Sequence, residues 1–193
     1  MTFILGLTGS IGMGKSTTAN LFKKHGVPVY DADQTVHDLY SGRLVPLIEA
    51  VFPGSTKEGA VDRAKLSTYV VGHPDKLKAL EAIVHPAVQE EQDRFIQKHR
   101  DSPLVVLDIP LLFENGKDRF CDAVAVVSTD AATQRKRVMM REGMTEEKLD
   151  SLLSRQMPDS EKRKKAQFII DTSLDIPDAE RQVLSILNAI STR

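Results

Sequence analysis

Short apolar segments recur along the chain and predict the strands of a sheet. They are continuous rather than alternating, which is typical of strands that are covered on both faces. The five segments are Phe3–Thr8, Val27–Tyr30, Leu104–Ile109, Ala123–Ser128 and Phe168–Asp171. Stretches with a helical spacing of apolar residues lie between them. This alternation predicts an α/β fold with a five-stranded parallel sheet.

The distances between the strands are uneven and predict two insertions. A single helix, about Lys15–His25 with Gly26 as its C-cap, connects the first strand to the second. More than 70 residues then separate the second strand from the third, which is too many for one crossover helix. We therefore expect a helical lobe at residues 34–100, with a proline in the first turn of two of its helices. The helices expected there are Asp62–Val71, Pro74–Val84 and Pro86–Arg100.

The second insertion lies between the fourth and fifth strands, at residues 134–165. Thr145 has the position and type of an N-cap, with acidic residues in the first turn of the helix that follows. The last helix is expected at about Pro177–Ile190. Its predicted buried face consists of Val183, Leu184, Ile186, Leu187 and Ile190. The expected core domain is formed by residues 1–33, 101–133 and 166–193.

Composition places the chain among soluble globular proteins. Of its 193 residues, 41% are hydrophobic and 27% are charged, which excludes a disordered chain. The formal net charge is −1, so no nucleic-acid partner is expected. The single cysteine, Cys121, excludes an intramolecular disulfide and an all-cysteine metal cluster.

The location of the protein is inferred from what the chain lacks. No apolar run reaches the roughly 20 residues of a membrane helix. The first residues lack the basic region of a signal peptide. We therefore expect a cytoplasmic protein without membrane contact, and a monomer or a weak homo-oligomer.

The strongest motif is a glycine-rich segment between the first strand and the first helix. Gly9–Ser16 matches the pattern G-x-x-x-x-G-K-S. Glycines allow several backbone N–H groups to point at one phosphate, and the following helix adds the positive potential of its N-terminus. Lys15 can reach the β- and γ-phosphates, and the Ser16 hydroxyl can ligate Mg²⁺. The motif predicts a nucleoside triphosphate site formed by Gly12, Met13, Gly14, Lys15, Ser16 and Thr17.

Carboxylates follow two of the predicted strands. Asp31 and Asp33 end the second strand, and residues two apart on an extended chain point the same way, so both could face the phosphate loop. A kinase uses such a carboxylate to orient the acceptor hydroxyl and accept its proton. Alternatively, one of the two caps a helix that begins near Gln34. Asp108 follows the third strand as in a Walker B motif, and either positions metal or substrate or merely ends the strand.

The second insertion is basic. Residues 134–165 contain ten basic and six acidic residues, a net charge of +4 in a chain of −1. Arg137 and Arg141 are four positions apart and are expected on one face of a helix. Arginine binds phosphate through its bidentate fork and can stabilise the charge that develops in phosphoryl transfer. We expect a lid that excludes water from the nucleotide, with the run Lys162–Lys165 solvated.

Several motifs together resemble the dephospho-coenzyme A kinase family of P-loop kinases. The resemblance covers nearly the whole chain and rests on the segments Leu7–Thr17, Asp31–Asp33, His85–Pro86, Asp108–Glu114 and Arg155–Gln156. It implies transfer of the γ-phosphoryl group of ATP to the ribose 3′-hydroxyl of dephospho-CoA. It also implies a P-loop core, a helical CoA-binding lobe at residues 34–100 and a helical lid, with Mg²⁺ as the metal.

The resemblance further implies roles for individual residues. Asp33 would be the general base, and Lys15 and Arg141 would bind the transferring phosphate. The ATP site would also include Arg137, Arg155 and Gln156. The residues expected to bind the acceptor are Asp31, His85, Asp108, Leu111, Leu112 and Phe113, although a lone histidine such as His85 is also typical of structural hydrogen bonding. Ser16 would hold Mg²⁺, with Asp33 or Asp108 through water.

Two other functions share a phosphate loop. A GTP-dependent switch would carry Asn-Lys-x-Asp, whereas this chain offers only Asn115–Asp118, with the lysine displaced by one position. Another small-acceptor kinase, of nucleotide or nucleoside type, would also carry a basic lid and is the nearer alternative. Two positions depart from the resembled family: Gln167 and Thr172 stand where similar proteins often have Asp and Asn, which leaves the adenine contacts there open.

Overall fold

The computed structural model describes residues 2–192, which divide into two compact units. The first unit comprises Met1–Tyr30 and His99–Arg193, and the second comprises Asp31–Lys98. The basic insertion at residues 134–165 therefore belongs to the first unit, and the lobe inserted between the second and third predicted strands forms the second.

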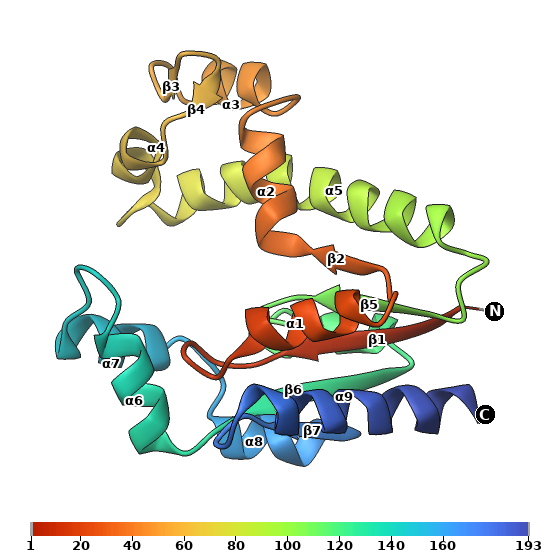
Figure 1. Ribbon diagram of the computed structural model, residues 1–193. Coiled ribbons are helices and arrows are strands. Elements are labelled where there is room, and N and C mark those ends of the chain that lie inside the picture. The colour runs from red at the N-terminus through yellow and green to blue at the C-terminus, as the bar shows by residue number, and fades with distance from the viewer. Residues whose placement is uncertain (1, 193) are drawn as a thin grey trace. The chain divides into compact units, whose positions relative to one another are not determined.

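The first unit is built on a five-stranded parallel sheet with the strand order β2-β5-β1-β6-β7 (Figure 1). The strands are β1 (Phe3–Thr8), β2 (Val29–Asp31), β5 (Leu104–Asp108), β6 (Ala123–Ser128) and β7 (Phe168–Asp171). The central strand β1 pairs in parallel with β5 on one side and with β6 on the other. This confirms the predicted sheet. The loops after β1 and its two neighbours open at the same carboxyl edge, where α/β sheets bind ligands.

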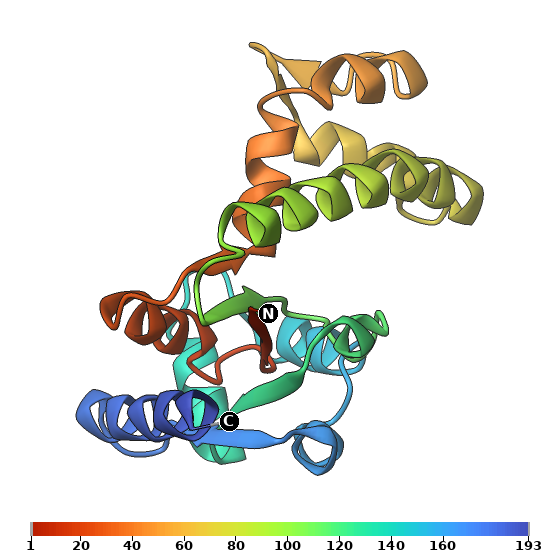
Figure 2. The ribbon, with the colours of Figure 1, turned by 90° about the vertical axis from the view of Figure 1, so that its right-hand side faces the viewer.

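Helices cover both faces of this sheet, as the continuous apolar strands require. Every residue of β5 and of β6 is buried. Figure 2 shows α1 (Lys15–Lys24) and α9 (Ile176–Ser191) on one face of the sheet and α8 (Asp159–Lys165) on the other. The core between the sheet and the helices α1 and α9 includes Leu5, Leu7, Phe22, Val106, Ile170, Val183 and Ile186.

The last helix, α9, begins after Asp175, whose carboxylate accepts a hydrogen bond of 2.8 Å from the backbone N–H of Asp178. Its buried residues are Ala179, Val183, Ile186 and Ile190. The prediction that Leu184 belongs to this buried face is wrong, because its side chain is 39% exposed. Each step along a helix rotates the side chain by about 100°, so Leu184 lies well away from the stripe that begins at Ala179.

The basic insertion contains α6 (Ala131–Met139), α7 (Glu146–Leu153) and α8. The predicted cap of α7 is confirmed, since the Thr145 hydroxyl accepts a hydrogen bond of 3.3 Å from the N–H of Lys148. Leu149 is the buried residue of α7. A helix with one buried side chain has little apolar packing to fix it.

The second unit contains four helices and a short antiparallel hairpin. Its elements are α2 (Ala32–Tyr40), α3 (Val45–Val51), β3 (Thr56–Lys57), β4 (Ala60–Val61), α4 (Arg63–Val70) and α5 (Pro74–Lys98). Its core consists of Leu39, Leu44, Ile48, Phe52, Val61, Leu66, Leu80, Val84 and Ala87. A helix near Gln34 was expected only as an alternative, and α2 is that helix. The helix α3 and the hairpin were not predicted, because such short elements show no clear period.

The long helix α5 corrects one prediction. Two helices were expected, the second beginning at Pro86, but α5 is continuous over 25 residues with Pro86 inside it. Proline removes the hydrogen bond to the carbonyl four residues earlier, at Ala82. Both Pro86 and Ala82 are exposed, so water can bind this carbonyl. The buried residues Leu80, Val84 and Ala87 hold the helix together on its other side.

The length of α5 does not make it a membrane helix. Within residues 2–192, no helix combines the length and the apolar character that crossing a membrane requires.

Candidate active site

The phosphate loop, Gly9–Ser16, connects β1 to α1. Gly12 has φ 80° and Gly14 has φ 91°, both in the left-handed region that favours glycine. A Cβ atom at Gly12 would also lie 2.5 Å from Cγ2 of Val138 in α6. Gly14 is the N-cap of α1, so the loop leads directly into a helix N-terminus, where anions bind.

Side chains from the basic insertion hold the loop in this shape. The backbone N–H of Ile11 donates to Oε1 of Gln156 at 3.2 Å, and the Ile11 carbonyl accepts from Nε2 of Gln134 at 2.8 Å. Gln134 lies in α6, and Gln156 follows α7. Gln156 is expected to bind ATP, and here its side chain supports the backbone of the phosphate loop.

Lys15 and Asp108 form an ion pair at the carboxyl edge of the sheet. Asp108 is the last residue of β5, and Lys15 is the first residue of α1, which follows the neighbouring strand β1. Their side chains are only 5% and 15% exposed. The structure therefore brings together the lysine of the glycine-rich motif and the acid that ends the third predicted strand.

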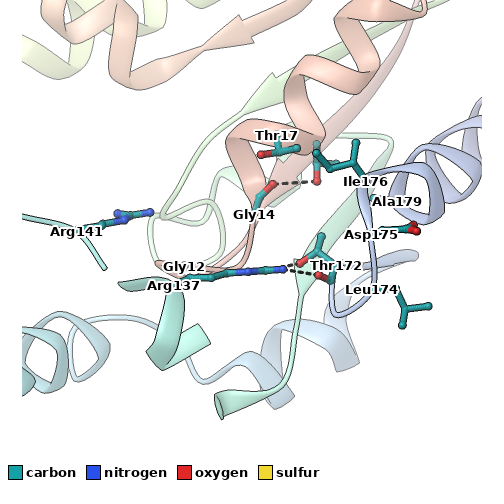
Figure 3. Close-up of a pocket in the computed structure, with 11 residues that line it drawn as sticks. Gly12, Gly14, Thr17, Arg137, Arg141, Thr172, Leu174, Asp175, Ile176 and Ala179 are labelled. Atoms are coloured by element: carbon teal, nitrogen blue, oxygen red, sulfur yellow. Dashed lines mark hydrogen bonds between the residues drawn. The ribbon is translucent and has the colours of Figure 1, made fainter. Parts of the chain in front are cut away.

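A cavity of about 240 Å³ lies beside the phosphate loop (Figure 3). Its lining consists of Gly12, Gly14, Thr17, Thr18, Arg137, Arg141, Thr172, Leu174, Asp175, Ile176 and Ala179. Leu174 and Ile176, before and at the start of α9, expose 71% and 58% of their surface. Two guanidinium groups together with exposed apolar side chains suit a ligand that has both an anionic and a flat apolar part.

Arg137 is fixed at one wall of this cavity. Its two terminal nitrogens donate to Thr172, one to Oγ1 at 2.9 Å and one to the carbonyl at 2.6 Å (Figure 3). The Thr172 hydroxyl donates in turn to the carbonyl of Met13 at 2.7 Å. Thr172, one of the two departures from the family pattern, thus connects Arg137 to the phosphate loop.

Arg141 lies beyond the end of α6, so the expectation that Arg137 and Arg141 share one helix face is wrong. The helix ends at Met139, and the N–H of Arg141 donates to the carbonyl of Val138, only three residues earlier. Arg141 therefore belongs to the turn that follows the helix. Arg141 is nevertheless exposed at the same cavity.

The second unit carries the two predicted carboxylates, and their local structure differs from the prediction. β2 ends at Asp31, and the chain is helical from Ala32 onwards, so the argument from an extended chain does not apply to Asp33. Oδ1 of Asp31 accepts a hydrogen bond of 2.9 Å from the N–H of Gln34. This confirms the alternative that one of the two caps a helix. Asp33 is exposed in the first turn of α2, and His85 is exposed on α5.

The remaining predicted residues differ in exposure. Ser16, Thr17 and Arg155 are exposed, and Leu111 is half-buried. Phe113 is 7% exposed and Leu112 is fully buried. The side chain of Leu112 therefore packs in the core of the first unit and does not line an acceptor surface.

The prediction that the run Lys162–Lys165 is solvated is wrong for its first member. Lys162 is fully buried, and its ammonium lies 2.9 Å from Oε1 of Glu114. Burial raises the pKa of Glu114, but the contact with Lys162 and the backbone N–H of Met157 outweigh this and hold the pKa below its ordinary value. Glu114 was not predicted as a site residue, although it ends the segment Asp108–Glu114, one of those on which the family resemblance rests.

Comparisons with known proteins agree with this geometry. The sequence profile of a family described as dephospho-CoA kinase matches residues 3–178. The dephospho-CoA kinase of Rhodopseudomonas palustris (strain HaA2) is 54% identical over 188 residues, which cover 96% of this chain and 94% of that protein.

Solved structures show the same similarity. The crystal structure of TT1252 from Thermus thermophilus has a TM-score of 0.86 at 34% identity, covering 97% of each chain. The dephospho-CoA kinase of Campylobacter jejuni has a TM-score of 0.67 at 25% identity, covering 98% of this chain and 97% of that one. With a profile that matches most of its length and a relative more than half identical across it, this chain belongs to the dephospho-CoA kinase family.

Proposed function

We propose that this protein transfers the γ-phosphoryl group of ATP to the ribose 3′-hydroxyl of dephospho-CoA, giving CoA and ADP. The observation that carries the proposal is the pairing of Lys15 with Asp108 beside the glycine-rich loop. Both residues lie at the carboxyl edge of the sheet, where α/β folds bind ligands, and this supports a contact between the motif lysine and the phosphates of a nucleotide. Membership of the dephospho-CoA kinase family supplies the acceptor.

The phosphates of ATP would lie on the phosphate loop. Loop N–H groups and the N-terminus of α1 favour negative charge there. Lys15 would then contact the β- and γ-phosphates, and Asp108 would keep its ammonium close to them. Arg141, exposed at the cavity, can stabilise the charge on the transferring group, which is where phosphoryl-transfer enzymes gain most of their rate. Arg155, which is also exposed, is a second candidate for this contact.

The base of ATP would occupy the cavity beside the loop. Arg137 already uses both terminal nitrogens on Thr172, so its planar face, rather than its N–H groups, is available to a ligand. Leu174 and Ile176 would supply apolar contact, which is favourable for a flat ring. This assignment gives the two arginines different tasks: Arg137 contacts the base, and Arg141 contacts the phosphates.

Mg²⁺ fits the groups at the start of α1. The Ser16 hydroxyl is exposed there, and Lys15 beside it contacts the carboxylate of Asp108. Residues 2–192 contain no group of three or more His, Cys, Asp or Glu side chains that could hold a metal on their own. The ion would therefore come with triphosphate oxygens and water, the coordination that Mg²⁺ favours. When bound, it would supply positive charge to the triphosphate.

Asp33 is the proposed general base. It is exposed in the first turn of α2, and an ionised carboxylate can accept both the hydrogen bond and the proton of a hydroxyl. Asp31 suits this task less well, because one of its oxygens already accepts the N–H of Gln34. His85, exposed on α5, stays a candidate for contact with the acceptor.

The test is an assay of ADP release over a panel of acceptors, with ATP and GTP as donors. We expect dephospho-CoA to give the highest kcat/KM, because binding of the pantetheine arm helps to position the 3′-hydroxyl. Equal kcat/KM for AMP or adenosine would overturn the acceptor and favour a nucleotide or nucleoside kinase. GTP hydrolysis that needs no acceptor would favour a switch; the residues Lys117–Phe120 form a 3₁₀ helix, which argues against a guanine-reading segment there.

A further inference from the structure

A buried cluster of charged side chains joins α8 to the core of the first unit. Lys162, fully buried in α8, lies 2.9 Å from Oε1 of Glu114. The same oxygen accepts the backbone N–H of Met157 at 2.7 Å. Asp159, the first residue of α8, accepts a hydrogen bond of 2.6 Å from the hydroxyl of Ser128 at the end of β6. These contacts fix the segment 157–162, which we call the anchor segment, to two different parts of the core.

The cluster is poorly explained by stability alone. Removing two charges from water costs about as much as their attraction returns, and apolar replacement of a buried pair is often neutral or stabilising. Here Oε2 of Glu114 and Oδ1 of Asp159 are buried and have no hydrogen-bond partner within residues 2–192. Such unsatisfied atoms lower the stability further. A use other than stability is therefore needed to account for a charged group at position 114.

Glu114 begins a short chain of contacts that ends on the phosphate loop. Its carboxylate binds the N–H of Met157, the first residue of the anchor segment. The preceding residue, Gln156, accepts the N–H of Ile11 in the phosphate loop at 3.2 Å. Glu114 therefore fixes the backbone next to Gln156, whose side chain supports the phosphate loop.

We propose that Glu114 is a positioning residue for the nucleotide site, which acts by accepting the Met157 N–H and so keeping Gln156 on the phosphate loop. Its essential property is then the acceptor oxygen, and Lys162 serves to balance the buried charge. Small displacements of groups that hold a ligand-binding loop reduce affinity without unfolding the protein. The inference rests on the proposed function only in that the ligand is a nucleotide.

The test compares two double variants that both remove the buried charges. Glu114→Gln/Lys162→Met keeps an acceptor oxygen at position 114, whereas Glu114→Leu/Lys162→Met does not. The probe is the Mg²⁺ complex of a non-hydrolysable ATP analogue, with its Kd measured by calorimetry and the Tm of each variant recorded beside it. We expect the first variant to stay within about twofold of the wild type and the second to bind about three- to tenfold more weakly, the loss typical of one hydrogen bond.

The readout separates positioning from a merely structural role. If the two double variants bind the analogue equally well, the proposal is overturned, whatever their Tm. Exchange of the Met157 amide hydrogen should also be faster only in the variant with leucine. If that variant fails to fold, the comparison is made at position 156 instead. Gln156→Leu removes the acceptor of the Ile11 N–H, whereas Gln156→Glu keeps an acceptor oxygen there. A wild-type Kd for Gln156→Leu overturns the proposal. Because the probe binds without an acceptor, an error in the identity of dephospho-CoA would appear in the acceptor panel and not here.

Discussion

The two units hold their candidate residues in different ways. In the first unit, Lys15 is paired with the buried Asp108, and Arg137 is bound through both terminal nitrogens by Thr172. In the second unit, Asp33 and His85 are exposed. Side chains that are already held by contacts lose less freedom on binding. Lys15 and Arg137 are therefore preorganised for the proposed nucleotide, whereas we expect Asp33 and His85 to gain their order when the proposed acceptor binds.

The largest expected effect tests the preorganised unit. Lys15→Ala should lower kcat by about 10²–10³-fold, as removal of one preorganised donor to a developing charge does. The fold should persist, because backbone angles and not this side chain shape the loop. Steady-state kinetics and a thermal melt measure both effects. Lys23→Ala, an exposed lysine on the same helix, is the matched control and should be near wild type. Phosphorylation of dephospho-CoA by Lys15→Ala at the wild-type rate would contradict the phosphate-loop assignment.

The next effect tests the second unit. Asp33→Asn should lower kcat by about 10²-fold, the low end for loss of a general base, because the loose transition state of phosphoryl transfer needs little early base assistance. Binding of an ATP analogue should change only a few-fold. Asp31→Asn is the control and should cost less, since asparagine can replace aspartate as the cap of α2. A collapse of kcat in Asp31→Asn with a normal rate in Asp33→Asn would move the base to the other carboxylate.

A third substitution separates backbone conformation from packing in the phosphate loop. Gly12→Ala and Gly143→Ala both place a Cβ atom at a positive φ, of 80° and 71°, which costs about 1–2 kcal/mol. Only at position 12 would the Cβ meet a neighbour, Cγ2 of Val138 at 2.5 Å, while position 143 is open. Gly12→Ala should therefore be the less stable variant and bind the ATP analogue more weakly. Equal free energies of unfolding would show that the close approach of α6 to the loop does not matter.

The sequence predicts the strands and the phosphate loop but not the contacts between distant side chains, and the reason is physical. Continuous apolar runs identify buried strands, and glycines at fixed spacing identify a backbone shape, because each signal lies within a few neighbouring residues. Side chains that meet across the fold leave no such signal. Lys162 pairs with Glu114, 48 positions away in the chain, and Arg137 donates a hydrogen bond to Thr172, 35 positions away. The run that contains Lys162 therefore looks like any other exposed basic segment.

In the second unit, a local signal is present in the sequence but does not decide the structure. Pro86 removes one helical hydrogen bond, as its residue type predicts, yet the helix continues because Leu80, Val84 and Ala87 are buried on its other side. Packing therefore outweighs the local preference. The hairpin of β3 and β4, with two residues in each strand, is too short for a period-2 pattern to be recognised.

This explanation of α5 predicts a gain in stability. Pro86→Ala supplies an N–H that can donate to the carbonyl of Ala82, and should raise the free energy of unfolding by about 2 kcal/mol, since a helix gain of about 3 kcal/mol is partly offset by a more flexible unfolded chain. Pro74→Ala, at the first position of the same helix, is the control and should give no such gain, because the N–H there has no helical partner. Equal melting temperatures for the two variants would mean that water or a local distortion already compensates at Ala82.

The smallest expected effect concerns the acid stability of the first unit. Burial raises the pKa of Glu114, but Lys162 and the Met157 N–H more than offset this, so the pKa in the folded protein lies below the ordinary value of 4.5. A carboxylate with a depressed pKa stabilises the folded state above its unfolded pKa, and this stabilisation is lost as the pH falls through the folded value. Wild-type protein should therefore lose more stability between pH 6 and about pH 3.5 than Glu114→Gln/Lys162→Met does.

The double variant is the appropriate reference because it keeps every other acid of the chain. Asp130, Asp171 and Glu180 also have pKa values held below normal by hydrogen bonds, and they destabilise both proteins alike in acid. The difference between the two unfolding curves, measured in urea at each pH, isolates the pair. Parallel curves over this range would show that the pKa of Glu114 is not lowered in the folded protein. Its oxygen could still accept the Met157 N–H, so such a result would separate the pKa of Glu114 from the positioning that its acceptor oxygen performs.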